Sequence, residues 1–349
     1  MNTLAAVAPG AVVGIDVGGT RIKAALLSTD GVVLGETTRP TPTDIGGRIG
    51  AVAAEIVHEL SGMLPQGRSR APSDASSHAP SDASSHVPSD AAGDVPPKVL
   101  AVGVAVPGWV DDAAGRALWS ANLGWRDLDL RDAVAAHCHL PVAVGQDVRA
   151  GLQGEHRFGA ARGVHNVLFV PLGTGLASAL LIAGRPVAGT FCAGEIGHVV
   201  IEPGGELCGC GQRGCLETVA SAGAIGRRWS ARSGSPGDAA DVARLTAEGD
   251  PLAASVWREA VEALAATLAP VVAATGTELV LVGGGLVRAG EVLLGPLRAA
   301  LTSRLGICDG VAIAAAALGD RAGALGAAAL ALDLLSTEPI PADRVPEGR

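Results

Sequence analysis

The sequence has very few aromatic side chains: only 2% of its 349 residues are Phe, Trp or Tyr, and tyrosine is absent. Base-stacking platforms and aromatic-rich protein interfaces need more of them. Basic residues are also in the minority, with 26 Lys and Arg against 35 Asp and Glu. A chain of net charge −9 without a basic cluster does not suit the nucleic-acid backbone. Both shortages exclude nucleic acid as the expected partner and favour a small molecule.

Long apolar runs are missing as well. Stretches such as AALALDLL fall well short of the roughly 20 residues that cross a membrane. The N-terminal MNTLAAVAPG has no basic region ahead of an apolar one, unlike a signal peptide. The six cysteines are unevenly spaced, unlike the framework of a secreted disulfide protein. We therefore expect a cytoplasmic protein with no membrane partner.

The chain is long enough for two lobes, and 48% of its residues are apolar. Runs of β-branched apolar residues alternate with stretches rich in Ala and Leu, which predicts an α/β protein. We expect strands at Val12–Val17, Val99–Val106, Val142–Gly145, Val167–Leu172 and Glu278–Val282. We expect helices at Ile45–Leu60, Asp147–Phe158, Leu252–Ala274 and Arg321–Leu335.

Two repeats organise the chain. GIDVGGTRIKAALLSTDGVVLGE (14–36) and FVPLGTGLASALLIAGRPVAG (169–189) share a strand, a glycine turn, an ALL strand, a tight turn and a returning strand. Each segment could begin one lobe, and a duplicated lobe leaves a cleft between the halves. The other repeat is APSDASSH, found twice in tandem within 71–97. Its Pro, Ser, Asp and Ala cannot form a core, so we expect a disordered surface insertion at 66–97.

Three glycine-rich turns follow expected strands. Glycines let backbone N–H groups approach phosphate oxygens, an Asp can hold hydrated Mg²⁺, and a hydroxyl or a lysine can meet the phosphates. The first turn is neither a Walker A loop nor G-x-G-x-x-G, because another strand and not a helix follows it. One such turn alone could be a plain hairpin, but three together favour a nucleotide cleft. The expected cofactor-binding residues are Asp16, Gly18, Gly19, Thr20, Lys23, Gly173, Thr174, Gly175, Gly283 and Gly284.

The order of motifs DVGGT, PGW, QDVRAG, PLGTG, EIGH, CGCGQRGCLE and VGGG resembles the ROK family of bacterial sugar kinases. The resemblance runs from about Val12 to about Leu335, and EIGH followed by CGCGQRGC is its most specific part. It implies a two-lobe ribonuclease-H-like fold of the actin-like ATPase and sugar kinase type, with a cleft between the lobes.

This family resemblance also sets the expected domains and partners. We expect a small lobe at 1–140, a large lobe at 141–320, and a C-terminal helix at about 321–337 that packs back on the small lobe. ATP with Mg²⁺ would donate its γ-phosphoryl group to the primary hydroxyl of glucose or a glucose-like acceptor, as in glucokinases. A homodimer or homotetramer is expected.

Three of the six cysteines lie within eight positions, close to a histidine. His198, Cys208, Cys210 and Cys215 provide the four donors of a closed tetrahedral Zn²⁺ site. Four protein ligands leave no open position for water, so the predicted zinc is structural and would hold a loop of little apolar content rigid. Reduced cysteines in a glycine-rich loop are the alternative. A disulfide between Cys208 and Cys210 is poorly placed, because one residue separates them.

The family resemblance assigns the acceptor site. In ROK kinases the Glu and His of E-x-G-H, and the Glu after the last cysteine, contact sugar hydroxyls, which implies this role for Glu195, His198 and Glu217. Asn122 in SANLGW matches a family asparagine that contacts the sugar, and Gly108 lies in the turn that closes the same pocket. The plainer alternatives are a turn residue for Asn122 and mere loop solubility for the two glutamates.

Asp147 is the expected catalytic base. Phosphoryl transfer needs a carboxylate that accepts the proton of the attacking hydroxyl, and Asp147 begins a helix directly after the strand VAVG. The same position suits a helix N-cap, which is the alternative. The family usually has Asn-Asp here, whereas this chain has Gln146-Asp147. The base is retained, but its changed neighbour leaves the acceptor open.

Other acceptors and functions stay open on the sequence. An N-acetylhexosamine or a glucose-like C7-cyclitol presents a similar array of hydroxyls, and polyphosphate could replace ATP. Sugar-sensing repressors of the family carry an N-terminal helix-turn-helix, whereas about ten residues precede the first expected strand here. A non-catalytic sugar-binding module is disfavoured because Asp16, Lys23 and Asp147 are all present.

Overall fold

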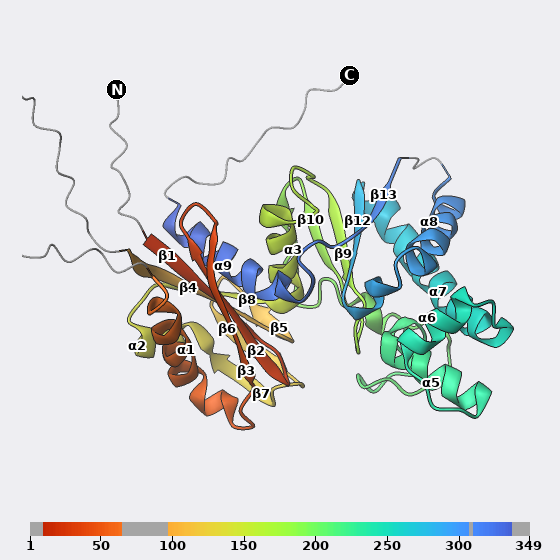
Figure 1. The fold of residues 1–349 in the computed structure, drawn as a ribbon, viewed down its shortest axis with the longest axis horizontal. Helices are drawn as coiled ribbons and strands as arrows, with labels where there is room; N and C mark the ends of the chain where they lie inside the picture. Colours follow the sequence, from red (N-terminus) through yellow and green to blue (C-terminus); the bar gives the residue numbers. More distant parts are fainter. Residues whose placement is uncertain (1–9, 65–96, 307–309, 337–349) are drawn as a thin grey trace, which may run out of the picture.

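The computed structural model describes residues 10–64, 97–306 and 310–336 (Figure 1). The insertion expected at 66–97 lies outside these residues, apart from Pro97. Two lobes are visible side by side, each built on a five-stranded sheet. This confirms the expected α/β fold with two lobes. Within the described ranges, no helix is long and apolar enough to cross a membrane.

The first lobe contains a sheet with the strand order β3-β2-β1-β4-β8. β1 pairs antiparallel with β2 and β2 with β3, whereas β1, β4 and β8 run parallel. The central strands are buried on both faces, as expected for parallel strands covered by helices. The strand bounds are β1 Gly10–Val17, β2 Arg21–Ser28, β3 Val33–Pro40, β4 Lys98–Val106 and β8 Val142–Gln146.

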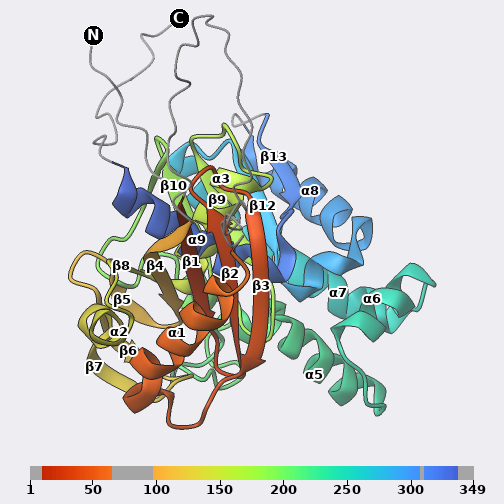
Figure 2. The same ribbon diagram turned by 60° about the vertical axis from the view of Figure 1, so that its left-hand side comes forward.

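Helices cover both faces of this sheet (Figure 2). α1 (Ile45–Ser61) and α2 (Leu130–Cys138) pack on one face, and α9 (Ala322–Leu335) packs on the other. α9 approaches so closely that a Cβ on Gly103 would lie 1.7 Å from the carbonyl oxygen of Ala327. Glycine is therefore required where this helix crosses the sheet.

The second lobe repeats the same strand plan in the order β11-β10-β9-β12-β13, with two antiparallel and two parallel pairings. The repeat between segments 14–36 and 169–189 is thus a repeat of three-stranded antiparallel units. The strand bounds are β9 Val167–Pro171, β10 Ala179–Ile182, β11 Arg185–Pro186, β12 Leu279–Gly283 and β13 Ala312–Ala315. Most of its helices form one large core with the sheet: α4 Glu217–Ala220, α5 Ala222–Ser233, α6 Ala239–Ala247, α7 Pro251–Thr275 and α8 Glu291–Leu305.

A small antiparallel sheet of β5 (Trp109–Asp111), β6 (Arg116–Ser120) and β7 (Trp125–Asp129) extends the first lobe beyond the end of β4. Val110, Ala117 and Trp125 join the core of this lobe. The sequence analysis did not predict these strands, because they are too short to show a clear periodicity.

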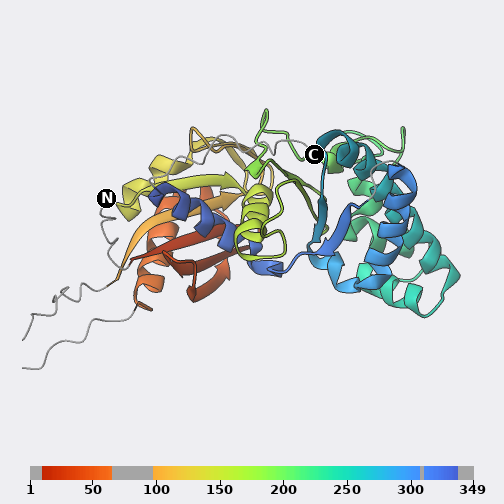
Figure 3. The ribbon, with the colours of Figure 1, turned by 90° about the horizontal axis from the view of Figure 1, so that it is seen from above.

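The two lobes are joined at α3 (Asp147–Phe158), which lies between them and packs against α9 (Figure 3). The buried carboxylate of Glu155 accepts hydrogen bonds from the backbone N–H groups of Ala160, Ala317 and Leu318 at 2.9, 3.1 and 2.7 Å. These donors belong to the two chain segments that cross between the lobes, so one side chain ties both crossings together.

The expected strands and helices are all present within a few residues of their predicted bounds. The boundary between the lobes differs from the predicted one. We placed it after residue 140, whereas β8 is the fifth strand of the first sheet and ends at Gln146. β8 belongs to this sheet because it pairs with β4 along its whole length.

Candidate functional site

Several of the predicted site residues lie at the carboxyl ends of the parallel strands of both sheets. Asp16 lies near the end of β1, and Asp147 directly follows β8. The turn from Gly173 follows β9, and Gly284 follows β12. In open α/β sheets, ligands bind outside this edge of the strands. The fold therefore directs both sets of residues toward the region between the lobes.

Asp16 and Asp147 are close enough for their charges to interact. The pKa of Asp16 is raised to about 7, mainly by burial and also by the charge of Asp147, whereas the charge of Lys23 opposes this shift. The pKa of Asp147 is raised to about 6, mainly by burial. The hydrogen bond from the N–H of Val148 lowers this pKa, whereas the charge of Glu195 raises it. When both carboxylates are ionised their charges repel each other, so binding of a divalent cation or a proton is favoured here.

Asp147 is the first residue of α3, but it is not the cap of this helix. Gln146 is the N-cap: its backbone is extended, and its side-chain Oε1 accepts from the N–H of Arg149 at 2.8 Å. Gln146 Nε2 donates to Asp147 Oδ1 at 2.7 Å, and the N–H of Val148 donates to the same oxygen at 2.8 Å. The alternative that Asp147 serves as the N-cap is therefore wrong.

The acidic residues of the second lobe continue this cluster. Glu195 lies just before the 3-10 helix η1 (Ile196–His198), and its Oε2 is 3.8 Å from His198 Nε2. Burial raises the pKa of Glu195, with His198 opposing this shift and Glu217 adding to it. Glu217 begins α4, and its Oε2 accepts from the N–H of Leu176 at 2.9 Å. The carboxylates of Asp147, Glu195 and Glu217 thus lie in one electrostatically connected group.

The four predicted metal ligands lie together. One donor atom from each of His198, Cys208, Cys210 and Cys215 falls within 4.8 Å of all the others. His198 Nδ1 is 3.5 Å from Cys208 Sγ, and Cys210 Sγ is 3.7 Å from Cys215 Sγ. Zn–S bonds of about 2.3 Å in a tetrahedron place two sulfurs about 3.7 Å apart. The donor set and its spacing fit zinc, and all three cysteines are free thiols.

His198 has two different neighbours at its two ring nitrogens. Nδ1 faces the cysteine cluster, whereas Nε2 faces Glu195. A cation on Nδ1 would leave Nε2 as a fixed N–H donor on the side of the acidic group. The metal cluster and the acidic group therefore share this histidine.

The first glycine turn connects β1 with β2 and lies beside Asn122. A Cβ on Gly19 would lie 3.4 Å from the carbonyl oxygen of Asn122. The carbonyl of Gly18 accepts from Thr41 Oγ1 at 2.6 Å. Lys23 pairs with Asp16 across the two strands, and its Nζ donates to the carbonyl of Asp320 at 3.1 Å. Thr20 and Gly19 are exposed, so backbone groups of this turn can meet a ligand.

Gly108 lies in the short link between β4 and β5, directly before the small sheet. Its φ is +107°, and a Cβ there would lie 2.1 Å from the carbonyl oxygen of Trp119. Both facts require glycine. Asn122 is exposed in the following β6–β7 turn.

The glycine turns of the second lobe lie against each other. The N–H of Leu172 donates to the carbonyl of Gly283 at 2.9 Å. Gly284 has a φ of +76°, and a Cβ there would lie 2.4 Å from the carbonyl oxygen of Leu172. The carbonyl of Gly173 accepts from the N–H of Ala222 at 2.9 Å, which places Thr174 and Gly175 at the start of α5.

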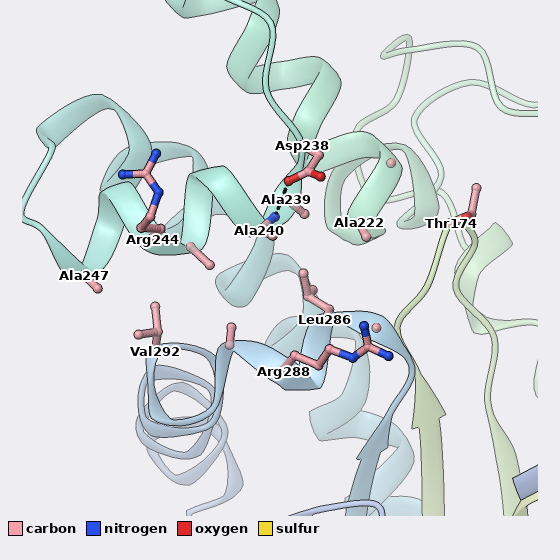
Figure 4. A pocket seen from close by; sticks show the side chains of 14 residues that line it. Thr174, Ala222, Asp238, Ala239, Ala240, Arg244, Ala247, Leu286, Arg288 and Val292 are labelled. Atoms are coloured by element: carbon pink, nitrogen blue, oxygen red, sulfur yellow. Dashed lines mark hydrogen bonds between the residues drawn. The ribbon is translucent and has the colours of Figure 1, made fainter. Parts of the chain in front are cut away.

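A cavity of about 580 Å³ opens beside these turns (Figure 4). Thr174 lies at one edge, α6 provides Ala239, Ala240 and Arg244, and the 3-10 helix η2 (Gly285–Ala289) provides Leu286 and Arg288. The walls consist mostly of small apolar side chains, with two arginines at the margin. This volume and lining suit a flat heterocycle with an attached sugar.

Several residues of the site escaped the sequence analysis. Arg149 is buried and binds Asp112 through two bonds, at 2.7 and 3.1 Å, which ties α3 to the small sheet. Its charge lowers the pKa of Asp147 and of Glu195, against the larger effect of burial. Asp112 lies 37 positions away, so no spacing rule indicates the pair. The cavity was also missed, because distant helices form it.

The sequence and the fold both match known proteins. Residues 44–334 match the ROK family. A glucokinase of Streptomyces coelicolor is 30% identical over 343 residues, which cover 92% of this chain and 98% of that protein. A kanosamine kinase of Amycolatopsis mediterranei is 37% identical over 189 residues, covering 53% of this chain and 61% of that protein.

Among solved structures, a ROK family glucokinase from Streptomyces griseus in complex with glucose and AMPPNP matches with a TM-score of 0.72. It is 30% identical, and the match covers 93% of this chain and 100% of that one. Sequence motifs, the duplicated strand plan and both kinds of comparison agree. The chain belongs to the ROK family.

Proposed function

We propose that the protein is an ATP-dependent sugar kinase that phosphorylates the primary hydroxyl of glucose or a glucose-like acceptor. The observation that carries this proposal is the placement of Asp147. The charge of Glu195, in the acidic group of the second lobe, acts on its carboxylate, and the charge of Asp147 in turn acts on Asp16 beside the first glycine turn. A base between an acceptor site and a phosphate site is what phosphoryl transfer requires.

In this mechanism the acceptor binds to Glu195, Glu217, His198 Nε2 and Asn122, with the Gly108 turn closing the pocket. Carboxylates and a fixed N–H donor can each meet a sugar hydroxyl, and together they orient the ring. Asp147 then accepts the proton of the primary hydroxyl as the hydroxyl oxygen attacks the γ-phosphorus; the bond from the γ-phosphorus to the bridging oxygen breaks, and ADP leaves. A base with a pKa of about 6, raised by burial, is ionised at neutral pH and still basic enough for this step.

ATP is assigned to the glycine turns and the cavity. The adenosine end suits the 580 Å³ cavity, and the phosphates suit the turns at Gly18–Thr20 and Gly173–Gly175. The site also fits Mg²⁺, because burial raises the pKa of the Asp16 carboxylate and a nearby divalent cation would favour its ionised form. Bound Mg²⁺ supplies charge neutralisation on the phosphates. Lys23 lies beside Asp16, where its ammonium group can contribute the same effect.

Zinc at His198, Cys208, Cys210 and Cys215 is proposed as a structural ion. When bound, it crosslinks a loop that otherwise has little apolar content. The loop ends at Glu217, and His198 belongs to both groups, so the rigidity of the loop positions the acceptor contacts. Free thiols as zinc ligands and ATP as the donor both suit the cytoplasm, which we propose as the location. A homodimer or homotetramer is proposed, and light scattering would test it.

The identity of the acceptor is the finer part of this proposal. Glucose comes first because glucokinases match along nearly the whole chain. The kanosamine kinase match keeps amino sugars open, and a glucose-like cyclitol or N-acetylhexosamine presents a similar set of hydroxyls. An ADP-release assay with glucose, mannose, fructose, kanosamine, N-acetylglucosamine, N-acetylmannosamine and C7-cyclitols tests the proposal. ADP release with none of them would refute it.

A further inference from the structure

The side chain of Gln146 makes two hydrogen bonds at the end of β8, and it is 7% exposed. Its Oε1 accepts from the N–H of Arg149 at 2.8 Å, and its Nε2 donates to Asp147 Oδ1 at 2.7 Å. The backbone N–H can only donate, so the amide oxygen must face Arg149. The amide NH₂ is then forced to face Asp147.

Asp147 Oδ1 receives a second hydrogen bond, from the N–H of Val148 at 2.8 Å. An oxygen atom has two lone pairs, so two donors occupy Oδ1 fully. The other oxygen, Oδ2, is then the one left to accept a proton from a substrate. Donors from the residue before Asp147 and from the residue after it therefore hold the carboxylate at Oδ1.

We propose that Gln146 is a positioning residue that fixes the Asp147 carboxylate so that Oδ2 receives the proton of the acceptor hydroxyl. This inference rests on the proposed kinase function, in which Asp147 is the base. Gln146 is assigned to the base and not to the acceptor, because its amide oxygen and one amide hydrogen are already engaged within the protein. The charge of Glu195, before η1, also acts on Asp147, and the charge of Asp147 acts on Asp16 of β1.

The test compares two substitutions that treat the cap and the contact to Asp147 differently. Gln146→Ser keeps a good N-cap, because serine caps helices well, but it removes the donor to Asp147. Gln146→Glu keeps the size and an acceptor for Arg149, but it places a second carboxylate against Asp147. The control is Asp129→Ser, which exchanges one good N-cap for another at α2, away from the site.

Steady-state kinetics with the best acceptor should show a split between kcat and KM. We expect Gln146→Ser to lower kcat about ten- to a hundredfold, as for loss of one hydrogen bond to a charged group, with an acceptor KM within about threefold of the wild type. Gln146→Glu should lower kcat further through like-charge repulsion. Asp129→Ser should leave both values unchanged, and melting temperatures should show that all variants are folded.

A double-substitution cycle separates positioning from other effects. In the Asp147→Asn background, Gln146→Ser should cause no further loss of kcat, because the base through which it acts is gone. A wild-type kcat in Gln146→Ser, or a raised KM with an unchanged kcat, would overturn the inference and leave the kinase proposal standing. A fully active Asp147→Asn variant would remove Asp147 as the base and refute this inference while leaving the kinase function, whereas an inactive wild type would refute the kinase function itself.

Discussion

Replacing Asp147 by Asn removes the proposed base and keeps its surroundings. Both hydrogen bonds to the side chain, from Gln146 Nε2 and from the N–H of Val148, end on Oδ1. The one oxygen of asparagine can accept both, so its amide group takes the place of Oδ2. We therefore expect a folded protein in which only the proton-accepting oxygen is lost.

The substitution should also stabilise the protein. Burial raises the pKa of Asp147 from 3.8 to about 6, which is a shift of about two units and corresponds to about 3 kcal/mol. Because the folded-state pKa is above the unfolded value, the folded protein is favoured while Asp147 is protonated. This contribution to the free energy of unfolding is lost as pH rises from about 4 to about 6. At pH 7.5 the buried Asp147 carboxylate is ionised, so the wild type has lost this whole contribution to its free energy of unfolding. A neutral Asn avoids the loss. The side chain still reaches solvent, so about 1–3 kcal/mol is expected, or a few degrees in Tm.

Activity should change in the opposite direction. Loss of a positioned base lowers kcat about 10²- to 10⁴-fold, measured by coupled ADP release. Acceptor binding, measured by calorimetric titration, should stay within several-fold of the wild type. A variant that is more stable, binds the acceptor and is nearly inactive would match all parts of the reasoning. An Asn variant that retains more than about a tenth of the wild-type kcat would remove Asp147 from the mechanism.

Three further predictions concern the metal, the pH dependence and the junction of the lobes. Purified protein should contain about one zinc per chain, and Cys210→Ser should lower both zinc content and acceptor affinity, whereas Cys192→Ser outside the cluster should change neither. Normal acceptor affinity in a zinc-free variant would contradict the structural role. Because burial raises the pKa of Asp147 to about 6, kcat/KM should fall as pH drops below about 6, and a flat profile down to pH 5 would exclude this base. Glu155→Gln should lower the free energy of unfolding by about 2–3 kcal/mol, since the one oxygen of an amide cannot accept from all three backbone N–H groups. An unchanged midpoint in a urea titration would refute this prediction.

Much of the fold was predictable because strands and helices leave local periodic patterns. The run from Gly10 to Val17 reads as a buried strand from its own residues, and α3 was expected at the residues where it occurs. The repeated strand and turn plan predicted the duplicated lobe, because both copies use the same short-range pattern. The spacing of His198 and the three cysteines likewise predicted their grouping, since ligands of one loop need only a short stretch of chain to meet.

The tertiary structure decided what depends on residues far apart in the chain. Glu155 accepts a hydrogen bond from Leu318, 163 positions along the chain, and Arg149 donates to Asp112, 37 positions away. No sequence pattern predicts contacts between residues so far apart. Gln146 reads as a conservative neighbour of the base until the N–H of Arg149 fixes which end of its amide faces Asp147. The sequence by itself determined which residues could form strands, turns and a metal cluster, because these depend on neighbours along the chain. Only the packing of the two sheets around α3 determined which carboxylates share one electrostatic environment, because burial and charge act through space.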